Sequence, residues 1–376
     1  MEFAPDWCMH PGELLADVLD ERGLRQSELA ERTGLSAKHI NQIIKKSIGI
    51  SPDVAILLER ALSTPADFWI RAEAEYQEYE SRQKAAAALD SYRDWAAKFD
   101  RPALERHGIL KPADSDTTMV DKLLKFFQVA TPAAFERTWV RPSVSFRRSQ
   151  AFTIDEPNTA VWLRLVELSA DAVPVAPFNP RLLRKAARAL PKLTTMTVPN
   201  GFIAARAALA EAGVALTFVR EIRGTRVCAA TWWITGDRPA IGITVRHKRP
   251  DNFWFSLLHE VGHVVLHPRR ESYLDLETTD PDDPAESEAN EFASGLLFPG
   301  DASERIARAR SQQDLILIAA ELGVGVPSVA GRYGKLTQDW KTFGRLRATI
   351  SEDDIRALEA AAAQVVHSLP VTPGMS

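Results

Sequence analysis

The residues with the clearest chemical potential in this chain are His259 and His263, with Glu260 between them. Residues four apart on a helix project from one face, so both imidazoles can bind the same metal ion. A catalytic zinc keeps one position for water and lowers the pKa of that water toward about 7, while a neighbouring carboxylate takes the proton. We therefore predict that His259 and His263 are zinc ligands and that Glu260 is the catalytic carboxylate.

A catalytic zinc normally has three protein ligands, and the segment 285–293 offers carboxylates on a second predicted helix. We predict Glu286 as the third ligand. Asn290 lies one turn later on the same face, where it can accept a hydrogen bond from a ligand imidazole and fix its orientation. Glu288 is the alternative ligand, because two residues along a helix turn a side chain by about 200°.

The elements that must position these residues are a strongly apolar helix from about 252 to 266 and a small sheet before it. Burying two histidines and a glutamate in such a helix without an ion would be costly, which favours a metal over a chance match to a short motif. His267, one turn beyond His263, could line a cleft or cap the helix end. Three segments rich in β-branched and aromatic residues predict the strands, at 214–219, 227–235 and 240–245.

A second functional pattern lies near the N-terminus. The spacing of Ala30, Gly34, Leu35 and Ile40 predicts a short helix, a tight turn and a second helix, which is the packing of a DNA-reading unit. The second helix would present side chains that reach bases or phosphates, and a glutamine can hold a phosphate at the start of the first. The predicted DNA-contacting residues are Gln26, Ser36, Lys38, His39, Gln42 and Lys45.

The charge of this region shows how DNA binding would have to work. Residues 1–80 contain eight Lys and Arg against fifteen Asp and Glu, a net charge of −7. Domains that bind DNA by charge alone are basic, so binding here depends on a local patch and on dimerisation. The alternative is a helical scaffold that binds protein.

Composition sets broad limits on the whole chain. Its 376 residues are 45% hydrophobic and 26% charged, with a net charge of −4, which is typical of a soluble globular protein with two or three domains. The two cysteines, Cys8 and Cys228, are far apart, so a disulfide framework is not expected and a reducing compartment is. The N-terminus lacks the pattern of a signal peptide, and no apolar run approaches the ~20 residues that span a bilayer. We expect a cytoplasmic protein with no membrane partner.

Two parts of the sequence resemble known families. Residues 200–335 resemble the ImmA/IrrE metallo-endopeptidases in three motifs: Asn252-Phe-Trp-Phe-Ser-Leu-Leu-His-Glu-Val-Gly-His, Glu286-Ser-Glu-Ala-Asn-Glu-Phe-Ala and Leu297-Phe-Pro. The first eighty residues resemble the HigA-type antitoxins of the Xre helix-turn-helix superfamily in four motifs: His10-Pro-Gly-Glu-Leu-Leu, Gln26-Ser-Glu-Leu-Ala, Gly49-Ile-Ser-Pro and Pro65-Ala-Asp-Phe-Trp.

The resemblance implies a zinc-dependent endopeptidase that cleaves a repressor or a related regulator in a stress, phage or toxin-antitoxin response. It makes His259, His263 and Glu286 the ligands and Glu260 the catalytic acid/base. HigA-like domains usually dimerise on palindromic operators and can neutralise a toxin partner. The alternative is an antitoxin-like repressor whose zinc domain senses a ligand or binds a partner without turnover.

These observations predict a mainly α-helical fold with a small β-sheet, in the α+β class. It combines a five-helix Xre-type domain with a zincin-like metallopeptidase domain. The expected boundaries are 1–80 for the helix-turn-helix DNA-binding domain, 81–115 for a connecting helix, 116–200 for a helical region of unknown role, 201–345 for the metallopeptidase domain and 346–376 for a C-terminal helix and tail.

Overall fold

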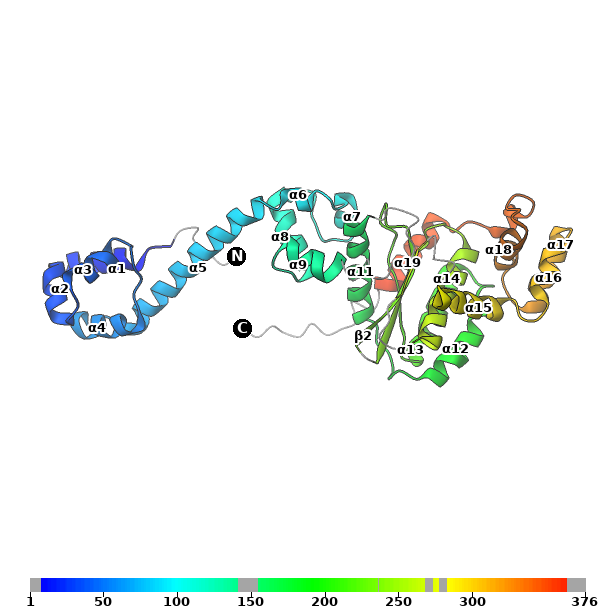
Figure 1. The fold of residues 1–376 in the computed structure, drawn as a ribbon, viewed down its shortest axis with the longest axis horizontal. Helices are drawn as coiled ribbons and strands as arrows, with labels where there is room; N and C mark the ends of the chain where they lie inside the picture. Colours follow the sequence, from blue (N-terminus) through cyan, green and yellow to red (C-terminus); the bar gives the residue numbers. More distant parts are fainter. Residues whose placement is uncertain (1–7, 141–154, 236, 268–272, 277–282, 364–376) are drawn as a thin grey trace. The chain divides into compact units, whose positions relative to one another are not determined.

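The computed structural model describes residues 8–140, 155–235, 237–267, 273–276 and 283–363 (Figure 1). The chain divides into two compact units. Unit 1 comprises residues 1–94 and 115–121, and unit 2 comprises residues 95–114 and 122–376.

Five helices build the N-terminal part of unit 1, as predicted. The side chain of Ser36 accepts a hydrogen bond from the His39 amide and caps the third of them, and Gly34 ends the second with a φ of 74°. Buried apolar side chains from all five helices form one core, which includes the fully buried Trp69. The helices are α1 (Pro11–Glu21), α2 (Gln26–Thr33), α3 (Ala37–Ile44), α4 (Pro52–Leu62) and α5 (Ala66–Asp90).

Residues 81–115 do not form the single connecting helix that we expected. Helix α5 ends at Asp90, and α6 (Arg93–Ala96) and α7 (Arg101–Arg106) follow as separate short helices. Trp95 and Phe99 are both buried and make edge contacts with the ring of Phe135. Burial of these large rings stabilises a local fold around residues 95–99, where a solvated helix would leave them exposed.

The remaining helices lie wholly or partly in unit 2. Among them are the segments predicted as helical within 116–200. They are α8 (Asp116–Phe127), α9 (Pro132–Phe135), the π-helix η1 (Glu136–Val140), α11 (Glu156–Asp171), α12 (Pro180–Leu193), α13 (Val198–Glu211), α14 (Pro250–Leu266), α15 (Pro284–Leu297), α16 (Ala302–Ala307), α17 (Gln312–Leu322), α18 (Val326–Thr337), the 3-10 helix η2 (Gly344–Arg347) and α19 (Glu352–Ala363).

The sheet of unit 2 has the strand order β1-β3-β2-β4. The strands β1 and β3 are parallel, whereas β2 is antiparallel to both of its neighbours. Three strands coincide with the predicted segments, and β4 is a fourth strand that was not predicted. Their bounds are β1 (Ala215–Phe218), β2 (Val227–Thr235), β3 (Arg238–Ile243) and β4 (Tyr273–Leu276).

Helices cover both faces of this sheet. On β3, a Cβ at Gly242 would lie 2.3 Å from a methyl group of Val166, so α11 packs directly on that face. The neighbours Ile241 and Ile243 point to the opposite face, because side chains alternate along a strand. On that face, Ile241 and Ile243 belong to one core together with buried side chains of α12, α13, α14, α17 and α19. Helix α14 therefore lies between the sheet and helices α15 and α18 (Figure 1).

The N-terminal end of α14 is held by a buried ion pair. Arg249 is the residue before the helix, and Asp251 lies in its first turn. The Asp251 carboxylate pairs with the Arg347 guanidinium at 2.6 Å, and Arg347 also stacks over the ring of Trp340. Residues 346–363 thus belong to the packed part of unit 2, whereas the predicted tail beyond 363 lies outside the described residues.

No helix in the described part of the chain is long and apolar enough by itself to cross a membrane. Helices α17 and α18 are long and apolar enough only when taken together, and the chain bends by 119° between them.

Candidate metal centre

Helix α14 brings the three motif residues into the interior of unit 2. The side chains of His259 and His263 are almost fully buried, and Glu260 is completely so. The helix backbone satisfies its own polar groups, which allows a long apolar helix to cross the core. On β2, the Thr231 hydroxyl donates a hydrogen bond to the Glu260 carbonyl oxygen at 3.4 Å and ties the motif to the sheet.

Helix α15 supplies the carboxylate. The Asp283 side chain accepts a hydrogen bond from the Ala285 amide at 3.0 Å and caps this helix one turn before Glu286. The two helices approach closely at Gly262, where a Cβ would lie 3.1 Å from the Phe292 ring and 3.3 Å from Ala289 Cα. This approach places Glu286 beside the two imidazoles.

Three ligand atoms converge between the helices. His259 Nε2 lies 2.9 Å from His263 Nε2, and Glu286 places one carboxylate oxygen 3.1 Å from the first and the other 3.4 Å from the second. Ligands bound to tetrahedral zinc at 2.0–2.1 Å are separated by about 3.3 Å, so the donor set and its spacing fit this metal. Among the described residues, this is the group of His, Cys, Asp or Glu side chains that could hold a metal ion.

The charge state of the cluster also suits a divalent cation. Burial lowers the pKa of His263 to about 4, against the opposing effect of the Glu286 carboxylate. Burial alone would raise the pKa of Glu286, but hydrogen bonds with His259 and His263 lower it to about 2. At neutral pH the site therefore offers a neutral imidazole and an ionised carboxylate, the forms that bind metal.

Each histidine has a partner at its second ring nitrogen. Asn290 Oδ1 lies 3.1 Å from His259 Nδ1. His263 Nδ1 lies 2.9 Å from His267 Nδ1, and His267 Nε2 lies 3.3 Å from Glu288 Oε2. Glu288 is thus outside the cluster of ligand atoms, on the partly exposed side of His267.

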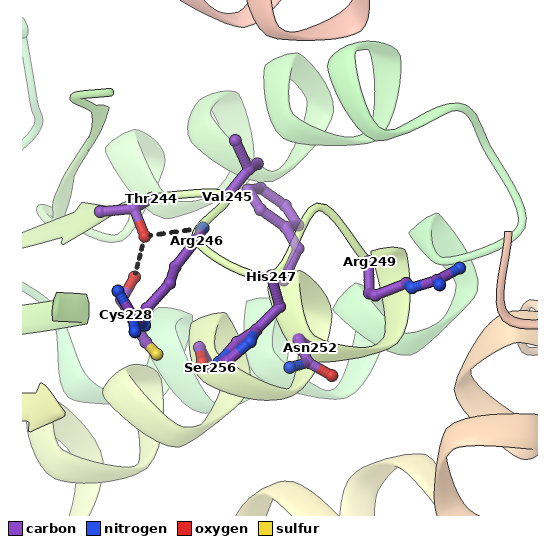
Figure 2. A pocket seen from close by; sticks show the side chains of 9 residues that line it. Cys228, Thr244, Val245, Arg246, His247, Arg249, Asn252 and Ser256 are labelled. Carbon is purple, nitrogen blue, oxygen red and sulfur yellow. Dashed lines mark hydrogen bonds between the residues drawn. The ribbon is translucent and has the colours of Figure 1, made fainter. Parts of the chain in front are cut away.

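A small hollow lies on the same face of α14, toward its N-terminus. At 100° per residue, Asn252, Ser256, His259 and His263 fall within about 60° of one another. Figure 2 shows the side chains of Asn252 and Ser256 below the loop that follows β3, together with the other residues around the hollow. It is lined by Cys228, Thr244, Val245, Arg246, His247, Arg249, Asn252, Phe253 and Ser256.

The predicted DNA-contacting residues lie on and around α3 in unit 1. Lys38 on this helix and Lys45 just after its end are exposed, while His39 and Gln42 are half-buried. Gln26 is exposed at the first position of α2. Ser36 is exposed too, but its hydroxyl oxygen also caps α3, so part of its role is local stability.

The contacts of His267 and Glu288 were not predicted from the sequence. The spacing of His263 and His267, four residues apart, could have indicated that their rings meet. Nothing in the spacing pointed to Glu288 as the next partner, because that contact depends on how α15 lies against the end of α14. The hollow around Arg246 and His247 was also missed, since its lining comes from three separate segments.

Known proteins share both parts of this chain. Residues 15–69 match the helix-turn-helix family, and residues 220–333 match the family described as the IrrE N-terminal-like domain, peptidase M78. Virulence-associated protein A of Dichelobacter nodosus is 38% identical over 69 residues, which are 18% of this chain and 68% of that protein. The chain belongs to the Xre-type helix-turn-helix family and carries an IrrE-like peptidase domain.

Other relatives of this helix-turn-helix protein each cover about a fifth of it. Virulence-associated protein I of Dichelobacter nodosus is 33% identical over 70 residues, 18% of this chain and 65% of that protein. An antidote protein of a plasmid maintenance system from Nostoc punctiforme has 27% identity and a TM-score of 0.22, covering 22% of this chain and 92% of that one. A HigA-family addiction module antidote protein from Coxiella burnetii has 23% identity and a TM-score of 0.21, covering 22% of this chain and 91% of that one. The family matches confirm both resemblances predicted from the sequence.

Proposed function

We propose that this protein is a DNA-binding regulator whose IrrE-like domain is a zinc endopeptidase that cleaves a regulatory protein. The observation that supports it most is the convergence of His259, His263 and Glu286 next to the buried Glu260. An IrrE-like peptidase domain and a DNA-binding domain in one chain favour a target that is itself a repressor or a partner of this protein.

The chain's own residues divide the chemistry among them. His259, His263 and Glu286 would hold the zinc, which when bound supplies a Lewis acid and a water with a pKa lowered toward about 7. Glu260 would accept the proton of the attacking water and return it to the leaving amine. Asn290 would fix the His259 ring.

The DNA-binding role rests on a local concentration of charge. Six of the eight Lys and Arg residues within 1–80 lie in the segment 22–46, which holds only two carboxylates. This basic segment contains α2 and α3. It therefore includes all of the predicted contacts, Gln26, Ser36, Lys38, His39, Gln42 and Lys45. We propose that a homodimer binds a palindromic operator through α3 and that a protein partner, a substrate or a toxin, completes the regulatory circuit.

A Glu260→Gln substitution tests the peptidase. The amide keeps the size of the side chain but cannot take a proton, so zinc content and the unfolding temperature should stay near wild type while cleavage falls by at least ~100-fold. Cleaved proteins would be identified by quantitative comparison of protein fragments in cells that contain either form. Equal fragment patterns with equal zinc content would contradict the peptidase and favour the alternative, a zinc domain that senses or binds without turnover.

A Lys38→Ala, Gln42→Ala double substitution tests the DNA interface. The binding site would first be selected from random duplexes with the wild-type protein, and affinities would then be measured at two salt concentrations. We expect weaker binding and a salt dependence reduced by about one unit for the lost lysine contact. Lys84→Ala, which removes an exposed cation on α5, is the matched control. Unchanged affinity in the double variant would place the DNA contact elsewhere.

A further inference from the structure

Three side chains form a continuous line from the candidate metal centre to the protein surface. His263 Nδ1 lies 2.9 Å from His267 Nδ1, and His267 Nε2 lies 3.3 Å from Glu288 Oε2. The His263 side chain is 1% exposed, that of His267 7% and that of Glu288 61%, so the line runs from the interior outward. The site chemistry described above uses neither His267 nor Glu288.

The hydrogen-bonding roles along this line have one consistent solution. His263 directs Nε2 at His259 and Glu286, so when that nitrogen binds metal the ring proton must be on Nδ1. Nδ1–H then donates to His267 Nδ1, which has to be the unprotonated acceptor. His267 consequently carries its own proton on Nε2 and donates it to the Glu288 carboxylate. Every nitrogen and oxygen in the line has one role.

We propose that His267 and Glu288 are positioning residues that fix the tautomer and the ring orientation of His263. The inference rests on the proposed zinc site, and it deepens that proposal by giving the second histidine ligand a partner, as Asn290 gives one to His259. Helix α15 then contributes more than the carboxylate ligand. It supplies Glu286 to the metal, Asn290 to one ligand ring and Glu288, through His267, to the other.

The position of His267 makes this arrangement possible. Helix α14 ends at Leu266, and the backbone of His267 is already extended, with φ −104° and ψ 159°. Its ring nevertheless stays 4.9 Å from the His263 ring, between that ring and α15. On α15, Glu288 faces away from Glu286, and its carboxylate reaches the outer nitrogen of His267 rather than the ligand cluster. The residue that we first weighed as an alternative ligand acts one step further out.

Loss of the hydrogen-bond partner His267 should weaken the retention of metal by His263. A ligand imidazole that has lost its hydrogen-bond acceptor can rotate and can place its proton on the coordinating nitrogen, and such partners are typically worth about 10–100-fold in metal affinity. His267→Phe keeps a ring without an acceptor, whereas His267→Gln keeps a carbonyl oxygen that can accept from His263 Nδ1–H. Glu288→Gln likewise keeps an acceptor that Glu288→Ala removes.

The experiment measures zinc release from the full chain into excess chelator, together with the visible absorption spectrum of the cobalt(II)-loaded protein. We expect His267→Phe to release zinc about 10–100-fold faster and to shift the cobalt bands. His267→Gln should restore most of the retention. Glu288→Ala should speed zinc release only severalfold, because its contact with His267 is exposed to water and therefore weaker. The release rate of Glu288→Gln should stay near that of the wild type. Glu291→Ala, an exposed carboxylate on the same helix, is the control.

Three outcomes would overturn the inference. Wild-type release and spectrum in His267→Phe would show that His263 needs no such partner. Equal losses in His267→Phe and His267→Gln would show that the position only fills space. Identical behaviour of Glu288→Ala and Glu291→Ala would remove Glu288 from the line. None of these readouts needs cleavage, so they stand apart from the Glu260→Gln test. A wild-type chain that binds no zinc at all would overturn the proposed function itself.

Discussion

Two histidines in unit 2, His263, which is buried, and His107, which is half-buried, show how the environment decides the use of a residue. Burial lowers the pKa of both His263 and His107 to about 4. His263 faces the Glu286 carboxylate, whereas the charges that act on His107 come from Arg106 and Arg220 and disfavour protonation further. His107 Nε2 makes no hydrogen bond with any described residue. We therefore interpret His107 as a neutral packing residue.

Because His107 is neutral when folded, it should make the protein acid-sensitive. The unfolded chain protonates this histidine below pH 6.5, whereas the folded protein does so only near pH 4. Stability is therefore unaffected above pH 6.5 and falls as the pH drops from 6.5 to 4, by at most about 3 kcal/mol from this group.

A His107→Phe variant should lose less stability than wild type over the same interval. The measurement is urea unfolding at steps between pH 7.5 and 4, in chelator, so that the titration of His263 contributes equally to both proteins. Parallel stability curves would contradict the prediction, and the difference at pH 7.5 gives the packing effect alone.

At the scale of elements, the distance between α14 and α15 controls the candidate site. Gly262 lies within the motif, and its missing Cβ allows Ala289 and Phe292 of the other helix to come close. All three candidate ligands, His259, His263 and Glu286, lie on these two helices. A small separation of the helices would therefore move Glu286 away from both imidazoles together.

A Gly262→Ala substitution should weaken zinc binding by about tenfold or more, because the added methyl group forces the helices apart by tenths of an ångström. Competition with a chromophoric chelator measures the affinity. Gly295→Ala is the matched control, since a Cβ there meets nothing within 4 Å and a mid-helix Gly→Ala change is neutral or stabilising by up to ~1 kcal/mol. Equal zinc affinity in the two variants would refute this role of Gly262.

At the scale of the whole molecule, the chain has separate apolar cores. The core of the N-terminal helices extends from Leu15 to Trp69, and the large core around α14 extends from Leu183 to Ala361. No buried residue belongs to both. We therefore propose that the DNA-binding and peptidase parts unfold as separate units.

Calorimetry of the full chain should show two transitions. Removing zinc should lower the midpoint temperature of one transition by several degrees and leave the other transition unchanged. The reason is that a ligand at 1,000 times its Kd stabilises only the unit that binds it, by about 4 kcal/mol. Adding selected operator DNA should raise the transition that zinc does not affect. A single transition that shifts with both ligands would contradict independent unfolding.

Much of this structure is determined by local rules that can be applied to the sequence alone. Helix α2 ends before Gly34 because only glycine readily adopts the left-handed turn there, and Ser36 starts α3 because its hydroxyl oxygen can cap the helix. The spacing of His259 and His263 places two imidazoles on one face of any α-helix. The five N-terminal helices, three of the strands and the pair of histidines followed from such short-range relations.

Contacts between distant segments were decided only by the tertiary structure. The sequence placed Glu286, Glu288 and Asn290 on one helix, but their division between the ligand cluster, His267 and His259 depends on how α15 lies against α14. The same holds for β4, which joins the sheet through the backbone of β2, and for the aromatic contacts that break up residues 81–115. Helix phase and capping act within a few residues, whereas these contacts arise from long-range packing.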